Sequence, residues 1–222
     1  MSRLRVHNLC VSLDGYAAGT HVTLEKPIGD ARALFSLVRH GSIHGIGGSD
    51  DPVGLDDVLT STWAQNIGAE IMGRRKFGPQ AGPWKPDDDW RGWWGEEPPF
   101  LTPVVVLTHH PREPLEFENG TVFHFVDADA PTALGMAREL AGGLDVRRGG
   151  GPSTVRQFLE ADLVDFLHIA VVPVTVGQGG SLLGGIEHVR ELFDIETVPS
   201  ASGVEHQLWN RRARESSAST PR

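Results

Sequence analysis

A run of glycines followed by hydroxyl side chains is the part of this sequence best suited to chemistry. Its residues are Gly149, Gly150, Gly151, Pro152, Ser153 and Thr154. The run follows a strand-like segment, residues 145–148, and precedes a helical pattern over residues 153–161. Glycines let the backbone approach a phosphate, and the free N–H groups of a first helical turn point toward it. The pattern therefore predicts an anion-binding turn, although a tight turn without a ligand has the same sequence.

Two upstream segments also place polar or basic groups where a strand is expected to end. The first consists of Gly73, Arg74, Arg75 and Lys76, and the second consists of Thr108, His109 and His110. Ligands of open α/β sheets bind outside the carboxyl ends of the strands, so the three segments can converge on one crevice. Arginine binds phosphate through a planar, forked guanidinium group. The segments together predict a site for a phosphate-rich ligand, and a solvated basic helix start remains the alternative for residues 74–76.

The acidic composition of the chain limits its partners. The 222 residues carry a formal net charge of −9 at pH 7. Nucleic acids and anionic lipids need a basic surface, so we expect neither as a partner. No apolar stretch approaches the roughly 20 residues of a membrane span, and we expect no membrane association. An anionic small molecule remains compatible with the chain because arginines can be placed locally.

The sequence patterns of several other protein classes are missing. Cys10 is the only cysteine, which excludes intrachain disulfides and cysteine metal clusters. His40 and His44 have helical spacing, but the adjacent glycines weaken a helix there, and we predict no metal site. The G-x-G-x-x-G fingerprint, the P-loop pattern and the G-x-S-x-G pattern are absent. The segment from Met1 to Leu4 leads into a strand pattern without a signal-peptide hydrophobic region, so we expect a cytoplasmic protein.

The hydrophobic pattern predicts a mixed α/β fold. Strands are expected over residues 4–13, 69–72, 103–108, 121–126, 145–148, 166–176, 192–198 and 204–211. Helices are expected over residues 30–39, 55–67, 131–140 and 153–161, with loops over 41–54 and 78–102. Apolar strands that alternate with helices favour a mainly parallel central sheet with helices on both faces, closed by an antiparallel C-terminal hairpin. We expect one domain over 1–211 and a disordered tail over 212–222.

A long insertion between two predicted strands, residues 79–103, is rich in tryptophan. Its four tryptophans are Trp84, Trp90, Trp93 and Trp94. They could cap a substrate site, cover a partner subunit or pack against the body of the protein. The sequence leaves these three roles open.

Four motifs in a fixed order resemble the dihydrofolate reductase-like superfamily. They are Ser12 to Gly15 (S-L-D-G), Ile71 to Arg75 (I-M-G-R-R), Val105 to Pro111 (V-V-L-T-H-H-P) and Gly149 to Thr154 (G-G-G-P-S-T). The pattern is most similar to the branch that contains the reductase domain of riboflavin biosynthesis enzymes. Residues 160–176 and 178–185 also resemble the sequence pattern of that branch. The similarity extends from Arg3 to Arg211.

This resemblance implies a dihydrofolate reductase-like architecture and a reductase that uses NADPH. The cofactor-binding residues that it implies are Gly73, Arg74, Arg75, Thr108, His109, Gly149, Gly150, Gly151, Pro152, Ser153 and Thr154. Residues 73–75 would hold cofactor phosphates, with an arginine near the 2′-phosphate, and residues 108–109 would flank the adenosine. Residues 149–154 would bind the pyrophosphate. The family often forms homodimers, and the strand over 166–176 with the closing segments is the expected interface.

The residues at the substrate end are harder to assign. Asp14 and Asp30 are candidate catalytic carboxylates, with an Asp-Gly turn and a helix N-cap as their respective alternatives. Asn8 and Ser12 are candidate substrate-binding residues on the first strand. The resemblance implies hydride transfer to a small pterin-, pyrimidine- or flavin-like substrate, and the insertion makes folate itself doubtful. The alternatives are an NADPH-binding module without catalysis and a flavin-associated reductase.

Overall fold

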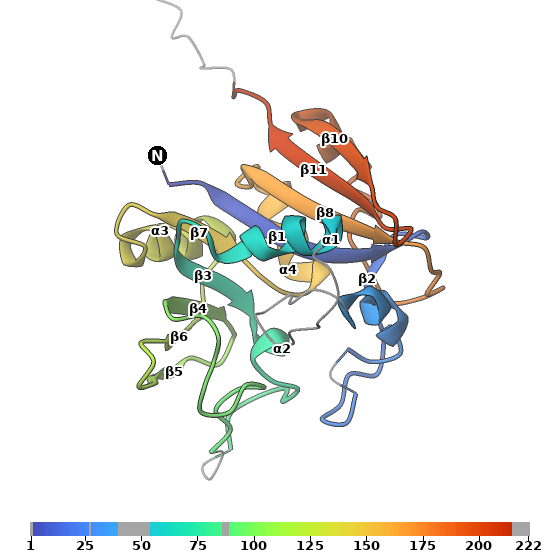
Figure 1. The fold of residues 1–222 in the computed structure, drawn as a ribbon. Helices are drawn as coiled ribbons and strands as arrows, with labels where there is room; N and C mark the ends of the chain where they lie inside the picture. Colours follow the sequence, from blue (N-terminus) through green and yellow to red (C-terminus); the bar gives the residue numbers. More distant parts are fainter. Residues whose placement is uncertain (1, 27, 40–53, 86–88, 215–222) are drawn as a thin grey trace, which may run out of the picture.

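A central sheet organises the computed structural model, which describes residues 2–26, 28–39, 54–85 and 89–214. In this described part, nine strands form one sheet in the order β10-β11-β8-β1-β7-β3-β4-β6-β5 (Figure 1). The strands are β1 (Leu4–Ser12), β3 (Ile67–Gly73), β4 (Pro103–Leu107), β5 (Arg112–Glu116), β6 (Val122–Val126), β7 (Asp145–Arg148), β8 (Phe166–Val172), β10 (Phe193–Pro199) and β11 (Glu205–Arg211). The six strands from β8 to β6 run parallel, and β5, β10 and β11 add antiparallel pairs at the two edges.

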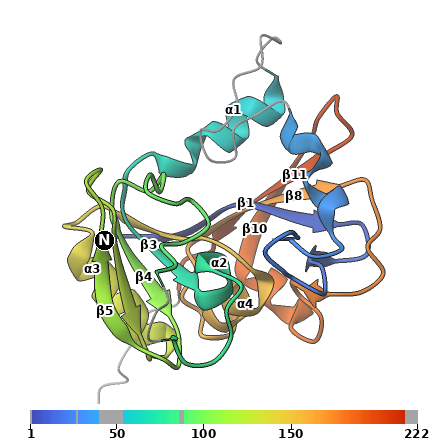
Figure 2. The same cartoon turned by 90° about the horizontal axis from the view of Figure 1, so that it is seen from below.

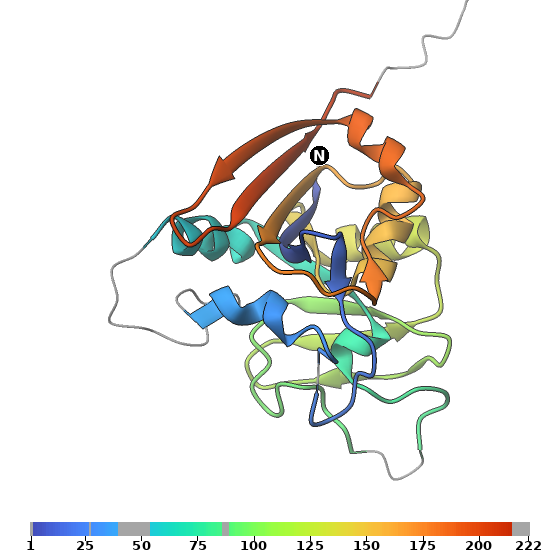
Figure 3. The same ribbon diagram turned by 90° about the vertical axis from the view of Figure 1, so that its right-hand side faces the viewer.

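Helices cover both faces of this sheet, as predicted. The helical elements are η1 (Arg32–Arg39), α1 (Leu55–Ser61), η2 (Thr62–Ala64), α2 (Arg74–Phe77), α3 (Ala130–Leu140), α4 (Pro152–Glu160) and η3 (Glu187–Leu192). Helices α3 and α4 lie on one face and α1 lies on the other (Figures 2 and 3). A short second sheet pairs β2 (Tyr16–Ala18) with β9 (Gly180–Ser181). The fold is therefore a mixed α/β architecture with a mainly parallel centre.

Local sequence explains how helix α3 begins and which of its faces is buried. The carboxylate of Asp129 accepts the backbone N–H of Thr132 at 2.9 Å and caps α3, and Pro131 occupies its first turn. The buried positions of α3 recur at helical spacing: Ala130, Ala133, Leu134 and Ala137. Small alanines on this stripe bring the helix close to β3 and β4.

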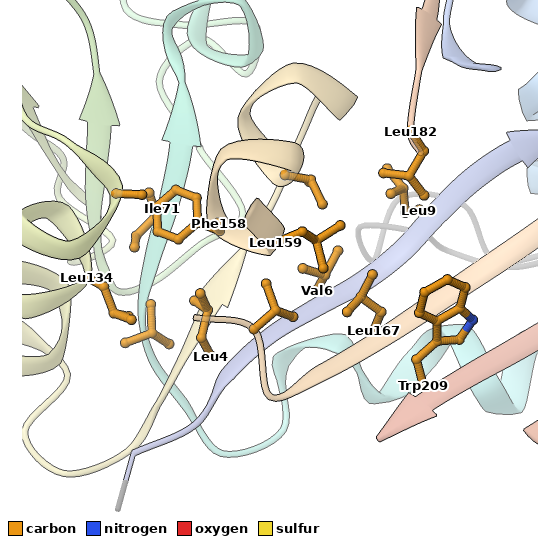
Figure 4. Close-up of a cluster of buried hydrophobic side chains, with 14 of the residues drawn as sticks. Leu4, Val6, Leu9, Ile71, Leu134, Phe158, Leu159, Leu167, Leu182 and Trp209 are labelled. Atoms are coloured by element: carbon orange, nitrogen blue, oxygen red, sulfur yellow. The ribbon is translucent and has the colours of Figure 1, made fainter. Parts of the chain in front are cut away.

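Two hydrophobic clusters lie on opposite faces of the sheet. The larger one joins β1, β8 and β11 to α3 and α4, and Figure 4 shows Leu4, Val6, Leu167 and Trp209 within it. The second cluster is largely aromatic and contains Met72, Phe77, Phe100, Val104, Val106, Phe117, Phe123 and Phe125. Three tryptophans of the insertion, at 84, 90 and 94, pack against this second cluster. The insertion therefore packs against the body of the protein, and Trp93 and Trp94 also line the cavity described below, so the predicted capping role stays open.

Several element boundaries differ from the sequence prediction. Strand β5 was not predicted, because an edge strand with one partner keeps polar side chains exposed and contains a proline. The predicted helix over 30–39 is a 3₁₀ helix, and the predicted helix over 55–67 ends at Ser61. Strand β8 stops at Val172, before Pro173, instead of at residue 176. The predicted loop over 41–54 lies outside the described residues except for Gly54.

The predicted dimer interface stays a prediction. Strand β8 lies inside the sheet, paired with β1 on one side and β11 on the other, so it cannot extend the sheet by pairing its edge with another chain. Strand β10 is the edge strand on that side of the sheet.

The predicted disordered tail begins with ordered contacts. Arg212 pairs with Asp194 and Arg214 pairs with Asp165, while residues 215–222 lie outside the described part. Among the described residues, no helix is long and apolar enough to cross a membrane.

Candidate active site

A cavity of about 1210 Å³ opens at the carboxyl ends of four neighbouring strands, β7, β3, β4 and β6. All three segments singled out in the sequence line it: residues 73–76, 108–110 and 149–154. On its other side it is lined by residues 6–10 of β1. The β1–β7 pairing ends at Val6 and Arg148, so these neighbouring strands part at the cavity. The predicted convergence of the three segments on one crevice is thus present in the fold, as expected for the crevice of an open α/β sheet.

A bulge in β1 turns two polar residues toward this cavity. The register of β1 against β8 shifts between Val6 and Leu9, and the intervening residues His7 and Asn8 line the cavity. Asn8 has a φ of 57°, a left-handed conformation that asparagine tolerates better than most residues. Bulges of this kind re-aim side chains beside functional sites. The placement of Asn8 agrees with its predicted substrate-binding role, which remains a prediction.

The glycine run forms the turn between β7 and α4. Gly151 is the N-cap of α4 and provides no side-chain cap, so the first N–H groups of this nine-residue helix are not satisfied by a capping side chain. Gly150 has a φ of 98°, where other residues are strained. A Cβ on Gly73 would lie 2.6 Å from Thr154 Oγ1, so the end of β3 packs directly against the start of α4. These features suit a backbone cradle for an anion.

The glycines also make room for a buried ion-pair cluster. A Cβ on Gly149 would overlap the Lys76 ammonium and the Glu70 carboxylate. Glu70 is 1% exposed on β3, and it accepts hydrogen bonds from Lys76 Nζ and Arg147 Nε, both at 2.6 Å. The Arg147 guanidinium also lies 4.0 Å from the ring centroid of Trp63. One carboxylate therefore holds two cations at the floor of the cavity.

Burial and ion pairing compete in setting the protonation of this cluster. Burial alone would raise the pKa of Glu70, but the charges of Arg147 and Lys76 outweigh it and hold that pKa below its usual value. Burial lowers the pKa of Lys76 to about 8, against the opposing effect of Glu70. Both groups are charged at pH 7, and Lys76 is the one closer to titrating.

A further buried arginine adds to this positive charge. Arg148 is fully buried, donates to the carbonyl of Ile71 at 3.4 Å, and has no protein hydrogen-bond partner at Nε or Nη2. Burial lowers the pKa of Arg148 to about 9, so it is charged at pH 7. The cavity lining contains the cations Arg74, Arg75, Lys76, Arg147 and Arg148 and the carboxylates Asp127 and Asp129. An acidic chain thus concentrates cations here, which favours an anionic ligand.

The predicted adenosine-end residues lie beside one another. Arg74 Nη1 donates to the buried Thr108 hydroxyl at 3.1 Å, which joins the ends of β3 and β4. His109 is exposed and lies 3.1 Å from Asp127, and Arg75 is also exposed. Arg74 and Thr108 are therefore held in place by the fold, whereas His109 and Arg75 reach solvent at the cavity rim.

A chain of hydrogen bonds leads from the cavity to the far side of the sheet. Asn8 Oδ1 lies 3.0 Å from His168 Nδ1, His168 Nε2 lies 2.8 Å from His206 Nδ1, and His206 Nε2 lies 2.7 Å from Asp56 Oδ1. The Asn8 amide also donates to the carbonyl of Thr60 at 2.9 Å. The chain crosses β1, β8 and β11 and ends on α1.

Donor and acceptor rules fix the protons in this chain. Asn8 donates with its amide nitrogen, so its oxygen accepts, and His168 Nδ1 carries a proton. Burial lowers the pKa of His168 to about 4, so this ring is neutral and its Nε2 accepts from His206 Nδ1. The other ring nitrogen of His206, Nε2, faces the Asp56 carboxylate. The chain locks the Asn8 amide in one orientation.

The two candidate catalytic carboxylates do not lie at the cavity. Asp14 accepts the backbone N–H groups of Val176 and Gly177, at 3.1 and 2.7 Å, and closes a turn. Asp30 binds the Thr20 hydroxyl and His21 at 3.0 Å each and is not the N-cap of a helix. Both are exposed, and neither lines the cavity. The carboxylates are used for loop closure, so their predicted catalytic role is not supported by this placement.

Ser12 also lies apart from the cavity. Its hydroxyl is buried and accepts the backbone N–H of Tyr16 at 3.0 Å. The described residues contain no group of three or more histidine, cysteine or acidic side chains that could hold a metal ion.

The sequence pattern did not predict the buried part of the site. It indicated no functional role for Glu70, Arg147 or His7, and it placed Arg148 only at the end of a strand. A signal was present, because two adjacent arginines on a short central strand, directly before a glycine run, are costly to bury without partners or a ligand. The partner of Arg147 lies 77 residues away at Glu70, which no local pattern indicates.

Removal of the central carboxylate should destabilise the fold. We expect Glu70→Gln to lower the free energy of unfolding by about 3–5 kcal/mol, because Arg147 and Lys76 lose their counter-charge in a buried place. Chemical denaturation at pH 7 measures this loss. Asp194→Asn removes one partner of the exposed pair with Arg212 and should change the midpoint little. Equal effects of the two substitutions would contradict the assigned role of Glu70.

The buried histidine chain should make stability depend on pH. The pKa of His168 is about 4 in the folded protein and 6.5 in model compounds, so the unfolded chain binds more protons between these values. Stability is therefore lost as the pH falls through this window, by roughly 2 kcal/mol between pH 7 and 5 from this residue. Denaturation curves of His168→Gln should show that much less loss, whereas the exposed His188→Gln should follow the unmodified protein. An unchanged slope in His168→Gln would refute the assignment.

Comparison with known proteins places this geometry in a family. The family model for the RibD C-terminal domain matches residues 6–204. A candidate riboflavin biosynthesis protein from Shewanella sp. PV-4 superposes with a TM-score of 0.56 at 18% identity, over 96% of this chain and all of the other. Dihydrofolate reductase from Enterococcus faecalis, in complex with NADP(H) and RAB-propyl, superposes with a TM-score of 0.52 at 15% identity, over 95% and 97%. No curated protein sequence matches the chain.

These similarities confirm the dihydrofolate reductase-like fold that the four motifs predicted. The family match extends over most of the chain, from β1 to the residue before β11. The matched residues include the strand ends and the glycine turn that line the cavity, and the chain belongs to the RibD C-terminal domain family.

Proposed function

We propose that this protein is an NADPH-dependent reductase that transfers a hydride to a small heterocyclic substrate. The observation that carries this proposal is the convergence of an uncapped helix N-terminus and five cationic side chains on one large cavity. A dinucleotide combines several phosphate charges with two flat rings, and it needs both anion-binding groups and a long cavity. The family match and the fold support a reductase.

The residues present fit such a cofactor. The backbone of residues 150–154 and the start of α4 would hold its pyrophosphate, and the partnerless nitrogens of Arg148 mark a positive charge that lacks a counter-ion. Arg74 and Thr108 would hold a further phosphate, and the exposed His109 and Arg75 would flank the adenosine end. The nicotinamide, when bound, would supply the hydride.

The β1 side of the cavity would receive the substrate. It combines apolar side chains, among them Leu9 and Phe35, with the polar side chains of His7 and Asn8. Burial, with a contribution from the charge of Arg5, lowers the pKa of His7 to about 3, so His7 is neutral at pH 7. Asn8 is locked by the histidine chain. Both residues would orient a flat ring through hydrogen bonds rather than by charge.

Binding and turnover together test the proposal. Calorimetric titration of the full chain should give saturable NADPH binding that is tighter than NADH binding. The absorbance of NADPH should then fall when a member of a pterin, pyrimidine or flavin panel is added. Binding of NADPH without oxidation across the panel would favour a catalytically silent module. No binding of either nucleotide at millimolar concentration would overturn the proposal.

Lys76 should make nucleotide binding depend on pH. The pKa of Lys76 is about 8 in the folded protein, so the cavity loses one positive charge between pH 7 and 9. We expect NADPH affinity to fall by about tenfold over this range. Lys76→Arg keeps the charge and should confine the fall to the upper end of the range, where Arg148, with a pKa of about 9, begins to lose its proton. The exposed Lys85→Gln should behave like the unmodified protein. An unchanged fall around pH 8 in Lys76→Arg would assign the effect to another group.

The homodimer and the cytoplasmic location remain predictions. Because both edges of β8 are paired within the chain, a dimer would not form by pairing of that strand. The edge strand β10 carries the exposed acidic residues Asp194 and Glu196, which oppose strand-to-strand pairing between two copies.

A further inference from the structure

The tryptophan-rich insertion contains one residue whose contacts reach the cavity indirectly. Trp84 does not line the cavity, whereas Arg74 does. The Arg74 guanidinium lies over the indole ring, with its Cζ 3.2 Å from the ring centroid. Trp84 can therefore affect a bound ligand only through the cavity-lining residues that it contacts, of which Arg74 is the cationic one.

A closed ring of contacts fixes this arginine. Arg74 Nη1 donates to Thr108 Oγ1 at 3.1 Å, and the same oxygen accepts the backbone N–H of His110 at 3.1 Å. The carbonyl of His110 accepts the Trp84 indole N–H at 2.6 Å. The indole ring then returns to the guanidinium. Each of the four residues is held by two others, so Arg74 cannot turn without breaking the ring.

The Trp84 ring is itself held from other sides. Arg112 Cζ lies 3.9 Å from its centroid, and Phe77 and Phe125 pack edge-on against it with centroids 6.0 and 5.3 Å away. Two guanidinium groups this close to one centroid would overlap on a single face, so the ring lies between Arg74 and Arg112. The indole is therefore a fixed platform.

The position of Arg74 separates it from the glycine cradle. The cradle follows β7, whereas Arg74 and Thr108 follow β3 and β4, which are the next two strands of the sheet. Neighbouring strands lie about 4.8 Å apart, so the two anion-binding places are about 5–10 Å apart. This spacing suits two phosphate groups of one ligand. A nucleotide with a phosphate beyond its pyrophosphate would use both places.

We propose that Trp84 positions Arg74 for the 2′-phosphate and thereby makes the insertion a determinant of the preference for NADPH over NADH. This inference rests on the proposed function. A free arginine side chain loses much rotamer freedom when it binds a phosphate, and a stacked guanidinium has already lost it. The stacking should therefore strengthen the contact that distinguishes the two nucleotides and leave their common contacts unchanged. Trp84 is a positioning residue in this scheme.

Calorimetry with NADPH and NADH on the full chain tests this role. Trp84→Leu should weaken NADPH binding by about tenfold, as expected for loss of a cation–π stack, and should change NADH binding by less than about twofold. Trp90→Leu is the matched control, because Trp90, like Trp84, belongs to the insertion, packs against the same aromatic cluster and does not line the cavity. It should leave the ratio of the two affinities unchanged.

A double-mutant cycle decides whether Trp84 acts through Arg74. Arg74→Ala alone should reduce the preference for NADPH, and adding Trp84→Leu should reduce it no further. Additive losses, or equal weakening of both nucleotides by Trp84→Leu, would overturn the inference. If Trp84→Leu does not fold, Trp84→Met takes its place in the cycle. It keeps a long apolar side chain but removes the aromatic ring over Arg74, and a preference equal to that of the unmodified protein would overturn the inference.

The same titrations separate this inference from the proposed function. If the unmodified protein binds neither nucleotide, the proposed function fails and the inference fails with it. If it prefers NADPH and Arg74→Ala removes that preference while Trp84→Leu does not, only the role of Trp84 is refuted.

Discussion

A single buried carboxylate sets the conditions under which this cavity can exist. Glu70 projects from the central strand β3 and is almost inaccessible to solvent, yet two cations share it, one from α2 and one from β7. Three ionised side chains in such a place are unfavourable unless each has a partner. The pairing holds the strands β3 and β7 in register at the point where the glycine turn begins. It also explains why glycines stand at 149 and 150, since side chains there would collide with Lys76.

The cluster leaves an excess of positive charge, and this excess shapes the chemistry of the cavity. Glu70 neutralises one of its two partners, and the adjacent Arg148 has no carboxylate of its own. The chain as a whole is acidic, with a net charge of −9. A strongly positive cavity in an acidic protein repels most cations and attracts small anions over a short range, because salt screens the field beyond about 10 Å. The electrostatics therefore favour an anionic ligand that enters the cavity over a partner that binds the outer surface.

Many of the strands and helices could be predicted from the sequence, because each is indicated by residues that are close together in the chain. The strands β1, β4 and β8 are largely apolar runs bounded by turn residues, and the glycine turn before α4 combines three local signals. The buried contacts could not be predicted, since Arg147 and Glu70, or His168 and Asn8, meet only after the sheet has formed. Asp14 and Asp30 show the converse case. Their types and positions suit catalysis, but each carboxylate binds loop groups nearby. An acidic residue beside a turn has such partners close at hand, whereas a catalytic role needs a particular tertiary position.

The two sides of the cavity are stiffened by different physical means, and the difference agrees with the tasks proposed for them. On the β4 side, aromatic stacking and cation–π contacts fix a charged group, which suits the recognition of phosphate by geometry and charge. On the β1 side, a chain of hydrogen-bonded histidines fixes an uncharged amide, which suits a ring that is recognised by hydrogen bonds. The strained backbone of Asn8 persists because the histidine chain and Thr60 hold its side chain from two directions. A hydride can pass only between rings held close together, so rigid walls on both sides are what such a reaction requires of the protein.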